Sequence, residues 1–388
     1  MKIFRTMPLG RLLLLLAVGT ALIIAGLLAV VARGGSGSTP PPKPLANAIH
    51  DALAAPQPEG VTARIEFTNK LFPSGALTGQ AGSALMSGAT GRLWANAHGG
   101  RLELQSDAGD TQITWNDTKV TVYDASSNTA YVADLPKDAS TQTTDAIPTL
   151  DEITKFLTDA ASHWAVSDAV PSNVAGQEAY TVTISPKHDG GLLGSAQLAW
   201  DAMHGTPLEV AVYAQGASAP VLALRANDIT FGSVSDSDIA AEPPANVKIV
   251  DLSSHTTPSS GGTDTPPVTG LAAVKAAAPF AVIAPDTLVG LPLRDIRLVG
   301  PADSRAALAV YGQGLGAIIV VERATDTSSS KSSGGLSSLP TISLDGVTAH
   351  ELATQLGTIL SWDNGGVSYV LAGSVPAAAA ESAARALK

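Results

Sequence analysis

The sequence predicts an α+β protein with a large antiparallel β-sheet, a smaller mixed domain and an apolar N-terminal segment. Residues from Val61 to Leu135 alternate between apolar and polar, which is typical of strands with one buried face. A helical pattern interrupts the strands at Thr149 to Trp164. A segment rich in Pro, Gly, Ser and Thr at residues 253–270 then separates the tail. The length of 388 residues fits about two domains.

An uncharged apolar run from Leu12 to Ala32 follows the basic residues Lys2, Arg5 and Arg11. As a helix, these 21 residues span roughly 30 Å, which is the thickness of a bilayer core. The apolar core of a secretory signal peptide is usually shorter, at about 7–15 residues. The run therefore predicts a transmembrane helix.

We expect residues 1–33 to form a cytoplasmic end and a single-pass anchor in the cell membrane. Cleavage after Val30-Val31-Ala32, which gives a secreted protein, remains the alternative. Both alternatives place the chain after Arg33 outside the cytoplasm. Residues 34–44, rich in Gly, Ser and Pro, are predicted to be a linker.

Composition excludes several classes of function. The formal net charge of −11 and the lack of a Lys/Arg cluster argue against nucleic acid as a partner. The sequence has no cysteine, which excludes disulfides, thiolate catalysis and cysteine-based metal sites. It also excludes the lipidated cysteine of a lipoprotein, so any membrane attachment must come from the peptide itself.

The first exported domain is predicted at residues 45–252. A short helix at Leu45 to Leu53 opens it, with apolar residues on one face. Short strands with turn signals about every ten residues then indicate an antiparallel meander. The expected strands are 61–68, 101–105, 113–115, 119–123 and 129–133 before the long helix, and 179–185, 196–201, 207–213 and 221–231 after it.

The long helix begins with a capping box, because Thr149 and Glu152 have the spacing at which each side chain binds a free backbone amide. Its apolar stripe comprises Ile153, Phe156, Leu157, Ala160 and Trp164.

The tail is predicted to be a small α+β domain at residues 271–388. Strands at 308–311 and 317–322 flank a Gly-rich turn, and strands at 357–362 and 366–372 pair across residues 363–365. A final Ala-rich helix is expected from about Pro376, with Ser374 or Val375 as its cap.

No motif for catalysis, phosphate binding or metal binding is present in the sequence: it has no G-x-S-x-G, Walker, H-E-x-x-H or EF-hand pattern. The seven histidines are scattered, without i, i+3 or i+4 pairs. We therefore expect a binding protein with no catalytic residues, no metal and no cofactor, and not an enzyme.

Two local patterns have structural interpretations that outweigh chemical ones. The stretch Gly312 to Gly316 resembles a phosphate loop, but the β-branched residues that follow indicate a strand and hence a hairpin turn. Asp151-Glu152 lies at a helix start, where negative charge is favoured, and residues 236–238 are expected in a polar loop.

The tryptophans Trp94, Trp115, Trp164 and Trp200 have two interpretations. They pack in the core, or they line a ligand cavity that needs large flat side chains as walls.

Several strand and turn motifs resemble the LolA-like outer-membrane lipoprotein-sorting family. They are GRLWANAHGGRLELQSDAGDTQITWNDTKVTVYDASSNTAYVADLP in the first half, and VAGQEAYTVTISP, AWDAMHGTPLEVAVYAQG and LALRANDITFG in the second. The resemblance covers about residues 45–252. The tail, with FAVIAPDTLVGLPL and LGTILSWDNGGVSYVLAGSVP, resembles the domain appended to related Gram-positive proteins and to RseB-type regulators.

The resemblance implies an open, curved antiparallel sheet, an unclosed half-barrel wrapped around helices, with an apolar cavity for acyl chains. It implies that basic residues near the cavity mouth help to close it, for which Arg92 and Arg101 are candidates. The expected ligand-binding residues are Trp94, Leu102, Leu104, Trp115, Trp200, Arg92 and Arg101.

The resulting hypothesis is a membrane-anchored extracytoplasmic protein of the cell envelope that binds lipid acyl chains or lipoproteins. The alternative is an RseB-like sensor whose C-terminal domain binds a membrane anti-sigma factor partner.

Overall fold

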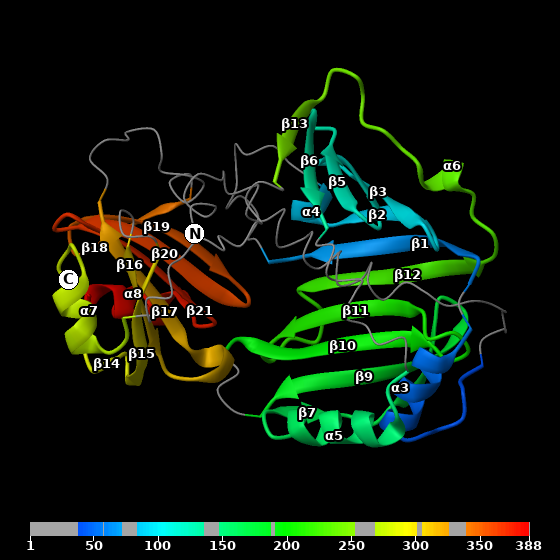
Figure 1. The fold of residues 1–388 in the computed structure, drawn as a ribbon, viewed down its shortest axis with the longest axis horizontal. Helices are drawn as coiled ribbons and strands as arrows, with labels where there is room; N and C mark the ends of the chain where they lie inside the picture. Colours follow the sequence, from blue (N-terminus) through cyan, green and yellow to red (C-terminus); the bar gives the residue numbers. More distant parts are fainter. Residues whose placement is uncertain are drawn as a thin grey trace.

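The computed structural model describes residues 38–387, except for 57, 72–83, 136–146, 188–190, 253–267, 301–304 and 326–338. The predicted transmembrane helix and most of the second predicted linker lie outside the described residues. Among the helices of the described ranges, none is long and apolar enough to cross a membrane. The described chain forms two β-sheets, one in each predicted exported domain (Figure 1).

The first sheet has the strand order β13-β6-β5-β4-β3-β2-β1-β12-β11-β10-β9-β7, with β8 also paired to β9. All pairs are antiparallel except β13 with β6. Its strands are β1 (Gly60–Asn69), β2 (Ala89–Asn96), β3 (Gly99–Ser106), β4 (Gly109–Asn116), β5 (Lys119–Asp124), β6 (Thr129–Asp134), β7 (Trp164–Val166), β8 (Val170–Val174), β9 (Gln177–Pro186), β10 (Leu193–Asp201), β11 (Pro207–Ala214), β12 (Leu222–Phe231) and β13 (Lys248–Asp251).

This sheet is strongly curled and open. Strands β3, β5 and β6 run steeply across the direction of β9 to β12 (Figure 1). The end strands β13 and β7 do not pair with each other, so the barrel is not closed. The open half-barrel expected from the motif resemblance is therefore present.

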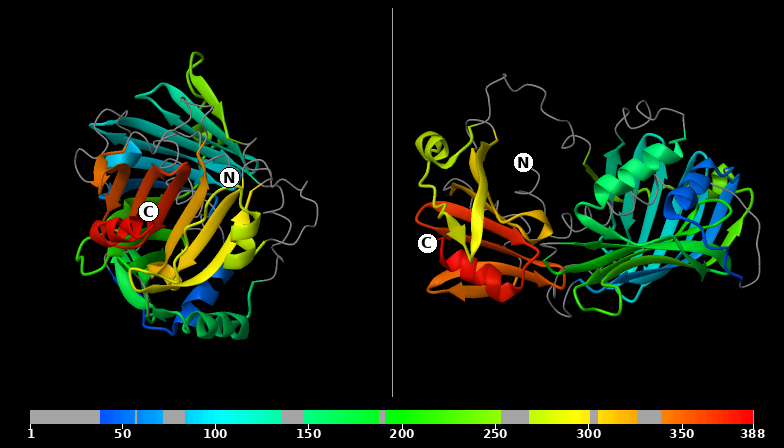
Figure 2. Two further views of the ribbon diagram at one scale, coloured as in Figure 1. Left: turned by 90° about the vertical axis from the view of Figure 1, so that its left-hand side faces the viewer. Right: turned by 90° about the horizontal axis from the view of Figure 1, so that it is seen from below.

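Four helices accompany the first sheet: α3 (Leu45–Ala54), α4 (Ala84–Ser87), α5 (Leu150–Ala160) and α6 (Asp236–Ile239). Helices α3 and α5 lie together on one side of the sheet (Figure 2). Leu45 and Ala48 of α3 pack there against Tyr180, Val182 and Trp200 of the strands. We call this helix-covered side the inner face.

Helix α5 has the predicted capping box between Thr149 and Glu152. The predicted end of the helix was wrong, because α5 stops at Ala160 and Trp164 begins β7 instead. Trp164 pairs there with Pro186 in the sheet, and this tertiary pairing overrides the helical spacing. The polar loop predicted at residues 236–238 is likewise wrong: Ser235 caps the short helix α6.

The second sheet has the order β14-β15-β16-β17-β21-β20-β19-β18. Its elements are α7 (Leu271–Ala277), β14 (Thr287–Leu288), β15 (Leu291–Val299), β16 (Ala306–Tyr311), a 3-10 turn at Gly314–Gly316, β17 (Ile318–Ala324), β18 (Thr341–Leu344), β19 (Val347–Thr354), β20 (Gly357–Asn364), β21 (Val367–Gly373) and α8 (Ala377–Arg385). Both predicted hairpins are confirmed. The last helix is capped by Pro376, one residue later than predicted.

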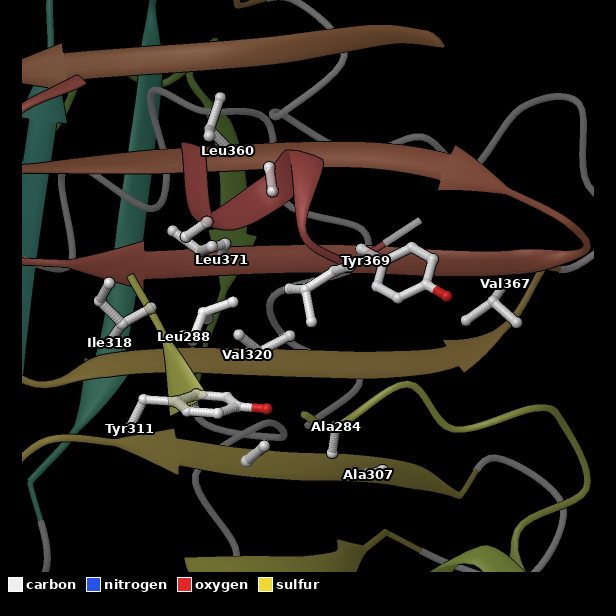
Figure 3. Close-up of a cluster of buried hydrophobic side chains, with 14 of the residues drawn as sticks. Ala284, Leu288, Ala307, Tyr311, Ile318, Val320, Leu360, Val367, Tyr369 and Leu371 are labelled. Atoms are coloured by element: carbon white, nitrogen blue, oxygen red, sulfur yellow. The ribbon is translucent and has the colours of Figure 1, made fainter. Parts of the chain in front are cut away.

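The core of the second sheet lies on the face that α8 covers. Tyr311 and Tyr369 lie there among Ile318, Val320 and Leu371 (Figure 3). The indole of Trp362 stacks on Tyr369 with ring centroids 5.0 Å apart. This core is therefore distinct from that of the first sheet.

The two sheets meet at one end of the first sheet. The backbone N–H of Leu192 donates to the carbonyl oxygen of Ser374 at 3.1 Å and lies 3.0 Å from its hydroxyl oxygen. Gln355 donates its side-chain amide to the carbonyl oxygen of Lys70 at 3.0 Å. Leu356 packs against a small cluster that includes Leu71. The C-terminal domain thus contacts the strand ends near residues 70 and 192.

Candidate functional site

The first half of the inner face is tightly buried. Leu104 is 1% exposed and packs with Ile113 and Val122 in the main cluster of this domain. Leu85 of α4 covers the same cluster. This half of the inner face serves as a packed core.

The second half of the inner face carries apolar side chains that are only half-buried. Leu198, Val210, Leu224 and Phe67 lie in register on β10, β11, β12 and β1, and each is partly exposed. Val182 on β9 continues the row and is buried. We call these five residues the inner band. At about 4.8 Å per strand, the band crosses about 19 Å of the sheet.

The alternation of the strands places this band on one face. Gln197 and Thr183, the neighbours of Leu198 and Val182, point to the other face and are hydrogen-bonded to each other at 3.3 Å. Because side chains alternate along a strand, the apolar residues gather under the helices while polar residues gather outside. The band is a continuous apolar strip suited to a long apolar ligand.

Helix α5 adds further apolar surface beside α3. Ile153 is buried and Leu157 packs against the α3 cluster, whereas Phe156 is 70% exposed and Leu150 is also exposed. On a helix these two exposed residues flank the buried stripe on opposite sides. Helix α5 therefore has a wide apolar face, and only the centre of this face is buried.

The predicted ligand-binding residues fall on two faces. Leu102 and Leu104 lie on the inner face, as core residues. The indole of Trp115, which packs on the same cluster, covers Gly100 so closely that a Cβ there would lie 2.2 Å from the ring. Trp200 is buried beside Tyr180, with ring centroids 6.2 Å apart. These four side chains pack the inner face.

The other three predicted residues, Trp94, Arg92 and Arg101, lie on the outer face. Trp94 and Arg101 are cross-strand partners, and the guanidinium of Arg101 lies 4.3 Å from the centre of the Trp94 ring. They are therefore not brought together with Leu102, Leu104, Trp115 and Trp200.

A shallow hollow of about 270 Å³ lies on the outer face. The side chains that line it include Arg64, Arg92, Trp94, Asp228 and Thr230. Arg64 and Arg92 lie directly opposite each other on β1 and β2, and within the described residues neither makes an ion pair. Like charges directly opposite are destabilising in a sheet, and the carboxylate of Asp228, opposite Arg64 on β12, is the nearest opposite charge along the ladder.

A buried His–Asp pair lies in the turn between β10 and β11. The carboxylate of Asp201 is hydrogen-bonded to Nδ1 of His204, and both residues are buried. Burial raises the pKa of Asp201, while His204 opposes this rise. The His204 ring also packs against Phe231, with ring centroids 4.9 Å apart. The hydrogen bond between Asp201 and His204 therefore links the end of β10 to the turn that follows it.

A second buried carboxylate lies in the C-terminal core. Glu322 is 1% exposed, and burial raises its pKa to about 7. One of its oxygens accepts the backbone N–H of Ile283 at 2.9 Å. Its other oxygen and the hydroxyl of Tyr311 have no hydrogen-bond partner within the described residues. The described ranges contain no group of three His, Cys, Asp or Glu residues that could hold a metal ion.

Sequence reasoning missed the inner band and the buried carboxylates of Asp201 and Glu322. The predicted strands 207–213 and 221–231 already alternate, so the band residues Val210 and Leu224 were visible as one face. The partner strands that bring them into one row are set by the sheet order, which alternation alone does not give.

No protein-family model matches this chain, and no curated protein sequence matches it. Among solved structures, the chain is similar to MucB in complex with the periplasmic part of MucA, with a TM-score of 0.41 and 14% identity over 89% of this chain and 96% of that one. The MucA/MucB complex of Pseudomonas aeruginosa gives a TM-score of 0.41 and 14% identity, over 87% and 95% of the chains.

A lipoprotein-sorting protein domain from Vibrio parahaemolyticus, described as putative in its own name, gives a TM-score of 0.20 and 11% identity, over 50% of this chain and 92% of that one.

Proposed function

We propose that this chain is a membrane-anchored extracytoplasmic binding protein that holds the acyl chain of a lipid or lipoprotein against the inner band. The observation that carries the proposal is the in-register row of half-buried apolar side chains on the inner face. A sheet face under helices is normally buried completely. Apolar side chains that stay partly exposed on such a face leave room for an apolar ligand.

The energetic basis is the removal of methylene groups from water. Each methylene contributes about 0.8 kcal/mol when it is fully buried, so a long acyl chain offsets the cost of ordering it. Helix α5 serves as a cover in this proposal, because Phe156 and Leu150 already present apolar surface to solvent. The chemistry needed is burial alone, and it requires no catalytic group.

A matched pair of substitutions on β10 tests the proposal. Leu198→Gln places a polar group in the inner band, and Gln197→Leu makes the reverse change one residue away on the outer face. We expect Leu198→Gln to weaken the uptake of a fluorescent fatty acid by about tenfold, since lost apolar burial of about 1.4 kcal/mol has this effect. Gln197→Leu should bind as the unmodified chain does. Equal binding by all three proteins would rule the site out.

A second candidate function is a sensor that binds a membrane protein through its C-terminal domain. The observation that favours it is a row of apolar residues on the face of the second sheet opposite α8. The residues of this row lie in register on neighbouring strands: Val310, Ile319, Ala372 and Ile359. Ile319 is exposed. Partly exposed apolar rows of this kind are typical of protein interfaces. In the two similar structures named above, MucB is bound to MucA.

Photo-crosslinking separates the two candidates. A crosslinking amino acid at Ile319, in the full chain in its native membrane, should capture one discrete partner protein. The same group at Ser382, which is exposed on α8, should capture none. Crosslinks to lipid alone at Ile319 would contradict the sensor function and leave the acyl-binding proposal standing.

A further inference from the structure

The N-terminal segment joins the first sheet at the turn between β8 and β9. The hydroxyl of Ser38 donates to the carboxylate of Glu178. The side-chain amide of Asn173 donates to the carbonyl oxygen of Ser38 at 3.0 Å. Asn173 and Glu178 face each other across this turn. The first described residue is therefore fixed to one end of the sheet.

The residues that follow stay on the same part of the sheet. The hydroxyl of Tyr180 donates to the carbonyl oxygen of Pro41 at 2.7 Å. Lys43 bridges to Ala169 and binds the carboxylate of Asp51 on α3. Helix α3 then lies on the inner face. Residues 38–54 are thus fixed to the sheet. The part of the predicted linker 34–44 that the structure describes, which we call the tether, is therefore not a free linker.

The C-terminal domain lies at the opposite end of the same strands. Its contacts with the first sheet include Leu192, which immediately precedes β10, and Lys70, which immediately follows β1. The other end of β10 lies beside Glu178, because Ala202 donates its backbone N–H to the carbonyl oxygen of Glu178. Strand β9 has 10 residues, so about 30 Å separate the two ends. Figure 1 shows α3 and the C-terminal domain on opposite sides of the first sheet.

The end at which the tether enters exposes large apolar side chains. Met203, in the turn between β10 and β11, is 55% exposed, and Leu53, in the last turn of α3, is 48% exposed. The two elements touch, because a Cβ at Gly205 would lie 2.5 Å from the carbonyl oxygen of Ala52.

We infer that this end of the first sheet, defined by Ser38, Leu53 and Met203 and called the tether end, docks on the surface of the lipid bilayer and holds the C-terminal domain away from it. The inference rests on the membrane anchor of the proposed function. From Ala32 to Ser38 the chain spans at most about 21 Å when fully extended. That reach is shorter than the strands, so the tether end is the part of the domain nearest to the membrane.

The chemistry of this end fits insertion between lipid headgroups. Exposed Leu and Met side chains insert into the interface because insertion removes their apolar surface from water. The net charge of −11 argues against electrostatic attraction to anionic lipids. Docking should therefore depend on apolar side chains and not on the charge of the vesicle. It also brings the inner face, where α3 lies, close to lipids that would supply acyl chains.

Single-cysteine labelling tests the inference, because the chain has no cysteine of its own. The full chain, reconstituted in phosphatidylcholine vesicles, carries an environment-sensitive fluorophore at Met203→Cys or Leu53→Cys. The matched control is Leu315→Cys, an apolar residue of the C-terminal domain that is 43% exposed. Lipids with a quencher near the headgroup should reduce the signal at 203 and 53 severalfold and leave the signal at 315 unchanged.

The inference is overturned by the absence of quenching at 203 and 53, by equal quenching at 315, or by quenching only in anionic vesicles. A shielded label that lipid quenchers do not reach indicates a second protein copy and also overturns it. Fatty-acid uptake by the same vesicles separates the two proposals. Normal uptake without quenching rejects the docking alone, whereas quenching without uptake rejects the acyl-binding function alone.

Discussion

Val210 on β11 lies directly opposite Leu224 on β12, and both side chains remain half-buried on the inner face of the curled sheet. Leu198 and Phe67 extend this pair on either side. Apolar pairs of this kind usually stabilise a sheet by packing against a covering layer. Here part of the apolar surface of the pair stays exposed, and this exposed surface is the physical basis of the acyl-binding proposal.

Polar substitution within this pair should affect binding more than folding. Val210→Asn removes apolar surface from the inner band, so we expect fatty-acid affinity to fall by about tenfold, since about 1.4 kcal/mol corresponds to a factor of ten. Tyr213→Phe, on the outer face of the same strand, should leave affinity unchanged. Isothermal titration calorimetry measures both, and equal losses in the two variants would contradict the placement of the ligand.

The exposed Phe156 predicts a kinetic effect. Phe156→Ala should leave the thermal midpoint nearly unchanged, because the side chain is largely in solvent. If α5 covers the ligand, the bound acyl chain should dissociate severalfold faster. Stopped-flow release of a fluorescent fatty acid measures the rate, and Lys155→Ala on the same helix is the control. An unchanged rate in Phe156→Ala removes α5 from the site.

Two His–Asp pairs in the first domain should respond differently to the loss of their carboxylate. Asp201→Ala breaks the buried pair with His204, so the free energy of unfolding should fall by about 3 kcal/mol. Asp236→Ala breaks the pair with His98, which is exposed on the surface, and should cause no measurable change. Urea unfolding monitored by tryptophan fluorescence measures both. Equal losses would show that the contribution of the Asp201 pair to the free energy of unfolding does not depend on its burial.

Glu322 should make the stability of the C-terminal domain depend on pH. Its folded-state pKa of about 7 lies above its ordinary value of 4.5, so the folded domain retains the proton to higher pH than the unfolded chain. The carboxyl group therefore favours folding fully below pH 4.5, and this contribution is lost as the pH rises to about 7. A shift of this size corresponds to about 3 kcal/mol.

Denaturant unfolding between pH 4.5 and 8 measures this effect. Glu322→Gln, which cannot ionise, should flatten the profile over that window and be more stable than the unmodified chain at pH 8. Glu381→Gln is the control, because this carboxylate of the same domain is partly exposed and ion-paired with Arg385. A profile that stays steep in Glu322→Gln assigns the pH dependence to another group.

The contact between the domains depends on Gly191. Its φ of +59° is favoured by glycine, and a Cβ there would lie 2.2 Å from the carbonyl oxygen of Ser374. Gly191→Ala should therefore separate the domains and split thermal unfolding into two transitions. Gly216→Ala, with a φ of +75° but open space around it, carries the strain without the clash. Calorimetry should show one transition in that control.

The sequence predicted local elements better than their assembly. The capping box of Thr149 and Glu152, the helix at Leu45 and the two C-terminal hairpins follow from local spacing, and all are present. Trp164 fits the helical stripe equally well, but its pairing with Pro186 is a tertiary contact that spacing does not encode.

The predicted site shows the same limit. Alternation places Leu102 and Leu104 on one face and Arg101 on the other, so the predicted site combined residues that one ligand on one face would not contact together. The inner band needs five strands in a given order, and two of them, β1 and β12, are more than 150 residues apart in the chain. Sheet order is a property of the whole domain, so local periodicity does not reveal it.

Native mass spectrometry of the full chain purified from a bacterial host tests the central claim most directly. We expect a bound species with the mass of a lipid or fatty acid, which is lost in Leu198→Gln and retained in Gln197→Leu. Protein that carries no such species, and takes up none when fatty acid is added, would contradict it.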